Sequence, residues 1–168
     1  MNSKPSPITL SSTQGQTLSI AGGNYRVLVS AKETDGEFAT IEMLVPPGGG
    51  PPPHSHANFT ETFYVVEGEV EFRSEAGAYV AKKGAYVTIT KGGIAHAFKN
   101  KTQNLAKLLC TVAPAGLEEV FTAIGKPVKA GEFLPPAPPD PEVMKTLASL
   151  NEKFGQQFYP PDFLDNVG

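Results

Sequence analysis

The three histidines of this chain are concentrated around one short segment. His54 and His56 are separated by one residue, Glu61 follows five residues after His56, and His96 is the only other histidine. Side chains alternate across a β-strand, so His54 and His56 face the same side of a strand, about 7 Å apart along it. Two imidazoles at this spacing can bind one ion, and the segment is therefore the strongest candidate for a metal site.

Glu61 has the opposite strand parity to His56, so we predict that the chain bends or bulges between them, at Asn58. Glu61 then begins a returning strand at 62–66 and lies beside the two imidazoles. His96 follows one or two hairpins later, which is within reach of the same point in a compact β-fold.

Three imidazoles and one carboxylate form a mixed nitrogen and oxygen ligand set. Such a set suits a divalent first-row transition metal and leaves two positions of an octahedron for water, substrate or dioxygen. Fe, Mn, Ni, Co and Zn all fit, and the ligand types do not distinguish among them. A single histidine in a strand usually packs without a ligand, but all three histidines beside one glutamate are difficult to assign to packing.

The segments that must position these side chains have the composition of short strands. Runs of β-branched and aromatic residues are separated by Gly, Asn or Lys-Gly turns, at 25–30, 38–45, 62–66, 69–73, 78–81, 86–90, 95–99 and 105–112. Strands this short and evenly spaced predict an all-β sandwich or barrel of antiparallel strands. The segment 46–53, with five prolines and three glycines, is an irregular loop that leads to His54.

Two amphipathic helices are predicted after Pro114. The first covers 117–124, where apolar residues recur at i, i+3, i+4 and i+7. The second covers 142–154, and its start is indicated by Asp140 as N-cap and Pro141 at the first helical position. The second helix packs on the barrel or on a second subunit. We therefore expect one domain over 1–168, with a barrel at about 18–113 and a helical, Pro-rich extension at 114–168.

Composition and charge limit the function classes. The 168 residues are 40% hydrophobic and 18% charged, with a net charge of −3, as in a globular protein. No basic stripe for nucleic acid and no apolar run of about 18 residues for a membrane is present. Cys110 is the only cysteine, and we predict that it is a small, buried, apolar core residue. Without a signal peptide pattern at the start, we expect a soluble cytoplasmic protein.

With these residues in place, the sequence resembles the cupin superfamily. Its first motif, G-x5-H-x-H-x4-E-x6-G, is matched by Gly48, His54, His56, Glu61 and Gly68. Its second motif, G-x5-P-x-G-x2-H-x3-N, is matched in part by Gly84, Gly93, His96 and Asn100. The chain departs from the second motif because Thr90 or Lys91 stands where proline belongs, and because one extra residue lies between Gly84 and Gly93.

The resemblance covers residues 36–113 approximately. It implies a small antiparallel jelly-roll β-barrel with a metal bound inside by His54, His56, Glu61 and His96, and often a homodimer. The chain also resembles single-domain bacterial cupins related to quercetin dioxygenases, which have a similar helical tail. Cupins include dioxygenases, isomerases, epimerases, decarboxylases and non-enzymatic binders, so the fold does not choose among these functions.

The expected surroundings of the metal suit a small organic ligand that chelates through two oxygens, such as an enol, a flavonol or an α-hydroxyketone. The residues expected around it are apolar: Ile41, Met43, Phe63, Val65, Phe72 and Phe98. In a dioxygenase, the metal orients substrate and dioxygen, and Glu61 is the candidate catalytic residue that takes the hydroxyl proton.

Two other functions stay open at this point. A metal-dependent isomerase or epimerase requires a second base, and a sugar-phosphate substrate also calls for Lys or Arg inside the barrel. The lysines near the site are expected in turns or facing outward: Lys82, Lys83, Lys91, Lys99 and Lys101. A non-enzymatic metal- or ligand-binding module has the same four ligands and no further polar group directed at the pocket.

Overall fold

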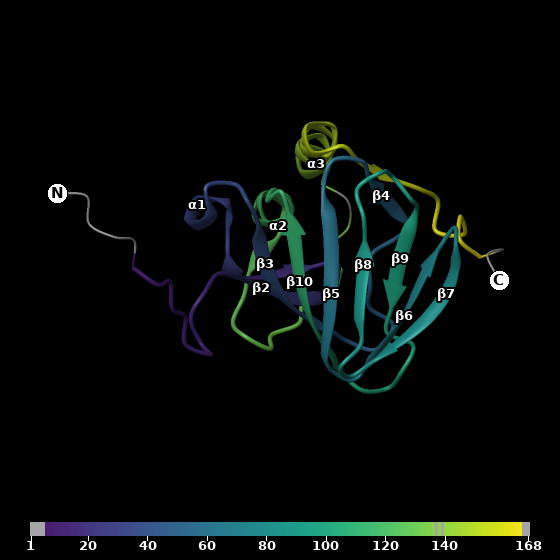
Figure 1. The fold of residues 1–168 in the computed structure, drawn as a ribbon, viewed down its shortest axis with the longest axis horizontal. Helices are drawn as coiled ribbons and strands as arrows, with labels where there is room; N and C mark the ends of the chain where they lie inside the picture. Colours follow the sequence, from purple (N-terminus) through teal and green to yellow (C-terminus); the bar gives the residue numbers. More distant parts are fainter. Residues whose placement is uncertain (1–5, 137, 139, 166–168) are drawn as a thin grey trace.

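Two antiparallel β-sheets face each other in the computed structural model, which describes residues 6–136, 138 and 140–165 (Figure 1). The seven-stranded sheet has the spatial order β11 (Lys126–Pro127), β1 (Thr17–Ile20), β2 (Gly23–Val29), β3 (Ala39–Val45), β10 (Ala106–Ala113), β5 (Thr60–Glu67), β8 (Tyr86–Ile89). The five-stranded sheet has the order β12 (Gln156–Phe158), β4 (His54–His56), β9 (His96–Lys99), β6 (Glu69–Ser74), β7 (Gly77–Lys82). The predicted all-β jelly-roll architecture is confirmed.

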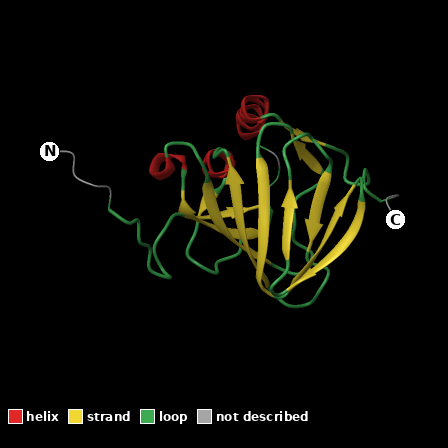
Figure 2. Cartoon of the chain, viewed as in Figure 1, coloured by secondary structure: helices red, strands yellow, loops and turns green. Residues whose placement is uncertain are grey.

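Three helices complete the described chain: α1 (Ala31–Thr34), α2 (Leu117–Ile124) and α3 (Pro141–Phe154). Figure 2 shows them toward one end of the sheets. The predicted start of the second tail helix is confirmed, because the Asp140 carboxylate accepts hydrogen bonds from the backbone N–H groups of Glu142 and Val143. Gly155, in the left-handed conformation, ends it.

The core lies between the two sheets and follows the alternation of the strands. On β3, every second residue from Ala39 to Val45 is buried, and β10 presents the same pattern from Ala106 to Val112. Three phenylalanines join the sheets: Phe63 comes from the seven-stranded sheet, while Phe72 and Phe98 come from the five-stranded sheet. Their ring centroids are 5.1–5.5 Å apart, so this aromatic group fixes the spacing of the sheets below the site.

The chain crosses from one sheet to the other between β4 and β5. β4 ends at His56 in the five-stranded sheet, and β5 begins at Thr60 in the seven-stranded sheet. The bend predicted at Asn58 is this crossing. It directs Glu61 from the opposite sheet toward the histidines, which explains how residues of unlike parity face one another.

A strand that the sequence did not predict covers the free edge of β4. β12 pairs with it in antiparallel register, with Gln156 opposite His56 and Phe158 opposite His54. The Tyr159 N–H then donates to the Pro53 carbonyl oxygen at 2.9 Å. The C-terminal segment is therefore part of the sheet that carries all three histidines.

Asn100 joins the loop before β4 to the end of β9. Its side-chain N–H groups donate to the carbonyl oxygens of Val45 and Asn104, at 2.9 and 2.7 Å, and Asn100 is fully buried. Its backbone N–H donates to the Gly49 carbonyl at 2.9 Å, and its carbonyl accepts from the Gly48 N–H at 2.7 Å. The asparagine thus fixes the glycine-rich loop against the strand that carries His96.

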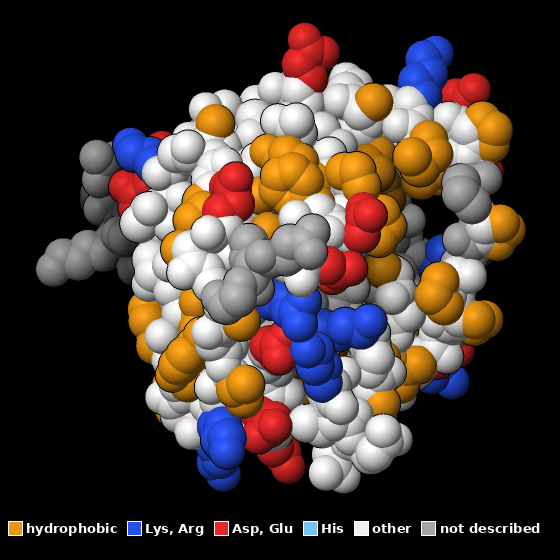
Figure 3. Space-filling view, turned by 90° about the vertical axis from the view of Figure 1, so that its right-hand side faces the viewer, with side chains coloured by type: hydrophobic (Ala, Val, Ile, Leu, Met, Phe, Trp, Pro, Cys, Tyr) orange, Lys and Arg blue, Asp and Glu red, His pale blue; other side chains and the backbone are white. Residues whose placement is uncertain are grey.

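Some of the charged side chains on the surface form ion pairs. On the face shown in Figure 3, Lys and Arg side chains lie among Asp and Glu side chains. On the five-stranded sheet, Glu71 contacts both Arg73 and Lys101, with nitrogen–oxygen distances of 2.6 and 2.7 Å. Within the described residues, none of the helices combines the length and the apolar character that crossing a membrane requires.

Candidate metal centre

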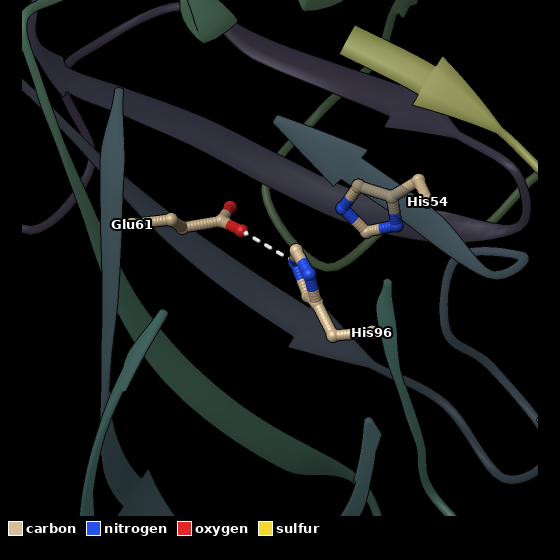
Figure 4. Close-up of side chains that lie close together, drawn as sticks. All are labelled: His54, Glu61 and His96. Atoms are coloured by element: carbon tan, nitrogen blue, oxygen red, sulfur yellow. Dashed lines mark ion pairs between the residues drawn. The ribbon is translucent and has the colours of Figure 1, made fainter. Parts of the chain in front are cut away.

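The predicted ligands come from three strands of the two facing sheets. His54 and His56 lie on β4, and His96 lies on the neighbouring β9, directly opposite His54. Glu61 projects from β5 of the other sheet toward His54 and His96 (Figure 4). All four side chains are buried, with exposed fractions between 1% and 7%. The fold therefore places them together inside the molecule.

The distances define one centre. The Glu61 Oε2 atom lies 3.4 Å from His56 Nε2 and 3.5 Å from His96 Nε2. One ligand atom each from His54, Glu61 and His96 lies within 4.8 Å of the others. The ring centroid of His96 is 4.4 Å from that of His54 and 4.8 Å from that of His56, whereas His54 and His56 are 6.2 Å apart. His96 thus lies between the two histidines of β4.

The backbone fixes the tautomer of every imidazole. The Nδ1 atoms of His54, His56 and His96 lie 3.0, 2.8 and 3.0 Å from the carbonyl oxygens of Pro52, Phe59 and Ile94, respectively. A carbonyl oxygen only accepts hydrogen bonds, so each Nδ1 carries the proton and donates. Each Nε2 therefore keeps its lone pair for the centre, as in histidines that bind metals.

Unsatisfied buried atoms provide a test of whether these residues fit a cation. His56 Nε2, His96 Nε2 and Glu61 Oε2 are shielded from solvent and have no hydrogen-bond partner in the described structure. Buried polar side-chain atoms are normally paired, because leaving one unpaired costs about 1–3 kcal/mol. Two lone pairs and a carboxylate oxygen directed at one point match a divalent transition metal, so the residues fit such an ion.

The electrostatics of the site agree with this assignment. Burial alone would raise the pKa of Glu61, and protons on the facing imidazoles of His56 and His96 would lower it well below its usual range. A cation bound at the same point supplies that positive charge in place of the protons. Burial and the nearby His96 lower the pKa of His54 to about 4. At neutral pH, Glu61 is therefore a carboxylate and His54 a neutral imidazole, which are the forms that bind metals.

The extra residue in the second motif does not keep His96 away from the others. The turn before β9 contains Gly92 and Gly93, with φ angles of 129° and 85°. Glycine reaches these angles without steric cost, so the turn accommodates the longer spacing. His96 is only 1% exposed and faces Glu61.

Two residues near Glu61 were not identified as functional from the sequence. The Cys110 thiol donates to Glu61 Oε1 at 3.3 Å, on the side away from the imidazoles. Burial and the Glu61 charge raise the pKa of Cys110, so it stays a neutral thiol and a donor. Tyr25 is also buried, and burial together with the negative charge of Glu61 raises its pKa. Their closeness to Glu61 could not be inferred from spacing, because the strands that carry them are distant from Glu61 in the sequence.

The thiol gives a testable prediction. Cys110→Val keeps the approximate shape but removes the donor to Glu61 Oε1, and we expect metal affinity to fall about 10- to 100-fold, as when other hydrogen-bond partners of metal ligands are lost. Cys110→Ser retains a donor and is expected to keep affinity within about threefold. Titration with a competing chelator measures both. Equal affinities for the two variants would show that the thiol does not support Glu61.

A cavity of about 560 Å³ opens onto the centre at His54 and Glu61 and lies under α2 and α3. Of the apolar residues expected there, Met43, Phe63 and Phe98 line it. The other three pack in the core instead: Ile41, Val65 and Phe72. Three polar residues in the lining were not anticipated: Tyr25, Asn151 and Gln156.

Residues 41–112 match a family model described as cupin domain. The chain is 24% identical over 139 residues to quercetin 2,3-dioxygenase of Bacillus subtilis (strain 168). This alignment covers 83% of this chain and 40% of that protein. It is 32% identical over 107 residues to germin-like protein subfamily 2 member 2 of Arabidopsis thaliana. That alignment covers 61% of this chain and 47% of the relative. The chain thus spans less than half the length of either relative.

Among solved structures, an RmlC-like cupin from Shewanella frigidimarina superimposes with a TM-score of 0.57 and 20% identity. The superposition covers 68% of this chain and 96% of that one. At this identity the likeness shows a shared fold.

Proposed function

We propose that this chain, whose residues 41–112 match the cupin domain model, is a metal-dependent dioxygenase. It would act on a small enol, flavonol or aromatic substrate inside the barrel. One observation carries the proposal: buried, unpaired Nε2 and carboxylate atoms converge beside a largely apolar cavity. His54, His56, Glu61 and His96 are the residues that would hold the metal. When bound, the metal would supply Lewis acidity toward substrate oxygens and activation of dioxygen.

Glu61 is the residue proposed to accept the substrate proton. It is the only acidic side chain among the described residues that line the cavity. Its lowered pKa keeps it ionised and makes it a weak base. It therefore suits a substrate whose hydroxyl is already acidic, such as an enol or a flavonol next to a cation. Cys110 holds the other carboxylate oxygen and keeps Oε2 directed at the site.

The apolar lining serves to position the substrate and to exclude water. α2 contributes Val120 and Phe121, and α3 contributes Leu147, on the side of the cavity away from the core. A planar, mostly apolar ligand can lie between this wall and the aromatic floor at Phe63 and Phe98. Both atoms of dioxygen enter the product of a dioxygenase, so no separate reductant is required.

The lining also bears on the other functions. No Lys or Arg is found among the described residues of the cavity wall, which disfavours a sugar-phosphate isomerase. A passive metal-binding module needs no polar groups beyond the ligands, yet Tyr25, Asn151 and Gln156 also face the cavity. The activity of the quercetin 2,3-dioxygenase relative agrees with the proposal.

Oxygen uptake tests the proposal. Protein loaded in turn with Fe, Mn, Ni, Co or Zn is mixed with a panel of flavonols and dihydroxylated aromatics, and an oxygen electrode records consumption. We expect substrate-dependent uptake with at least one metal, at about 1 s⁻¹ or faster. Protein carrying His96→Ala is the matched control. Stoichiometric metal without uptake in any combination would favour a binder or an isomerase.

The organisation of 1–168 as one domain, the homodimer and the cytoplasmic location stay predictions. Analytical ultracentrifugation of the full chain tests the homodimer.

A further inference from the structure

Two side-chain amides in the cavity wall lack partners. The Oδ1 atom of Asn151 and the Oε1 atom of Gln156 are shielded from solvent and accept no hydrogen bond in the described structure. Both residues line the cavity that opens onto the candidate metal centre. Unpaired buried acceptors are rare in folded proteins and mark places where a ligand can supply donors.

The position of Gln156 follows from strand pairing. It lies opposite His56 in the β12–β4 ladder, and Phe158 lies opposite His54. Directly opposed residues of antiparallel strands point to the same face of a sheet, so Gln156 shares the face of the metal-directed histidines. The Phe158 ring lies 5.8 Å from that of His54, between centroids. Gln157 alternates to the other face and is exposed.

Asn151 is the polar member of an otherwise apolar helix stripe. Met144, Leu147, Ala148 and Asn151 follow the spacing of one helix face, and all four line the cavity. The helix ends at Phe154, Gly155 caps it, and β12 follows directly. Asn151 and Gln156 therefore approach the cavity from one continuous segment, on the side of β4.

We propose that Asn151 and Gln156 form a hydroxyl-recognition subsite that selects polyhydroxylated ligands. A ligand held at the metal through its enol and ketone oxygens would donate further hydroxyl groups to the two amide oxygens. The apolar wall accepts the aromatic rings, and the amides distinguish hydroxylated from unsubstituted ring systems. This inference rests on the proposed function, because it requires the ligand to bind at the metal end.

Binding measurements without oxygen test the subsite apart from turnover. The metal-loaded full chain is titrated with the parent flavonol, whose only hydroxyl is the chelating one, and with quercetin, which carries further hydroxyls. We expect the wild type to bind quercetin at least about tenfold more tightly. Asn151→Leu and Gln156→Leu should each remove most of this preference and change the Kd of the parent flavonol less than about twofold.

Two further variants separate recognition from general perturbation. Gln157→Leu changes the same residue type on the exposed face of the same strand and is expected to keep the full preference. Asn151→Asp retains an acceptor and is expected to keep part of it. Without ligand, both leucine variants should melt at or above the wild-type temperature, because an unpaired buried acceptor is removed.

The outcomes separate the two proposals. Equal affinity of the wild type for both ligands, or leucine variants that keep the preference, overturns the subsite alone. A fall in Tm of more than about 4 °C in both leucine variants also overturns it, because the amides would then serve the fold. Failure of the metal-loaded wild type to bind either ligand overturns the proposed function and the subsite with it.

Discussion

Replacing His96 with alanine is expected to lower the metal that co-purifies with the protein from about one ion per chain to less than about 0.1. The variant removes the imidazole that lies between His54 and His56 and whose Nε2 faces Glu61 at 3.5 Å. Loss of a hydrogen-bond partner of a ligand already costs about 10- to 100-fold in affinity, so loss of a ligand costs more. Elemental analysis of protein purified without added metal measures the content.

Lys99→Ala is the matched control for this experiment. Lys99 lies on the same strand but is exposed, and its replacement should leave the metal content unchanged. His56→Ala then tests whether the ligand set contains three or four residues. His56 contacts Glu61, but its ring lies farther from the His54 ring than the His96 ring does. A wild-type protein with only trace metal, or a His96→Ala protein with full metal, would contradict a site at this position.

Local spacing explains why the positions of His54, His56 and Glu61 could be predicted. His54 and His56 are separated by one residue, so strand alternation alone places them on one face. Glu61 required one more step, the bend at Asn58, which its parity demanded. That bend is the crossing between sheets. Each inference spans fewer than ten residues, a distance over which backbone geometry leaves few alternatives.

The position of His96 could be predicted only approximately, from its place one or two hairpins later and from its motif. Its partner across the ladder, His54, is distant in the sequence, and the extra residue before it made the register ambiguous. The structure resolves the ambiguity through two glycines with positive φ angles and through Asn100, which ties the end of β9 to the Gly48 and Gly49 backbone. Turn flexibility of this kind has no signature in residue spacing alone.

The remaining residues of the cavity could not be predicted because their convergence depends on long-range pairing. Cys110 reaches Glu61 only because β10 lies beside β5, and on an apolar strand it was indistinguishable from a core residue. Gln156 lies on a three-residue strand with two glutamines, which carries no strand signal. Asn151 was not identified because it lies on a helix whose apolar face was assigned to packing.

Gly50→Ala is expected to destabilise the protein by about 3 kcal/mol and to lower its metal content. Gly50 has a φ angle of 142°, and an added Cβ would collide with the carbonyl oxygen of Phe98. Overpacking costs about 1–3 kcal/mol and an unfavourable backbone conformation a similar amount. The collision pushes apart the loop that leads to His54 and the strand that carries His96, so both ligands move. Urea unfolding and elemental analysis measure the two effects.

Gly48→Ala separates the collision from the backbone strain. Gly48 lies in the same loop with a φ angle of 75°, but a Cβ there would meet nothing within 4 Å. We expect it to cost only about 1–2 kcal/mol, the penalty of a left-handed conformation, and to leave the metal content near that of the wild type. Equal losses for the two variants would mean that strain alone limits this loop. A larger loss for Gly50→Ala assigns to that glycine the close contact through which the loop and β9 hold His54 and His96 together.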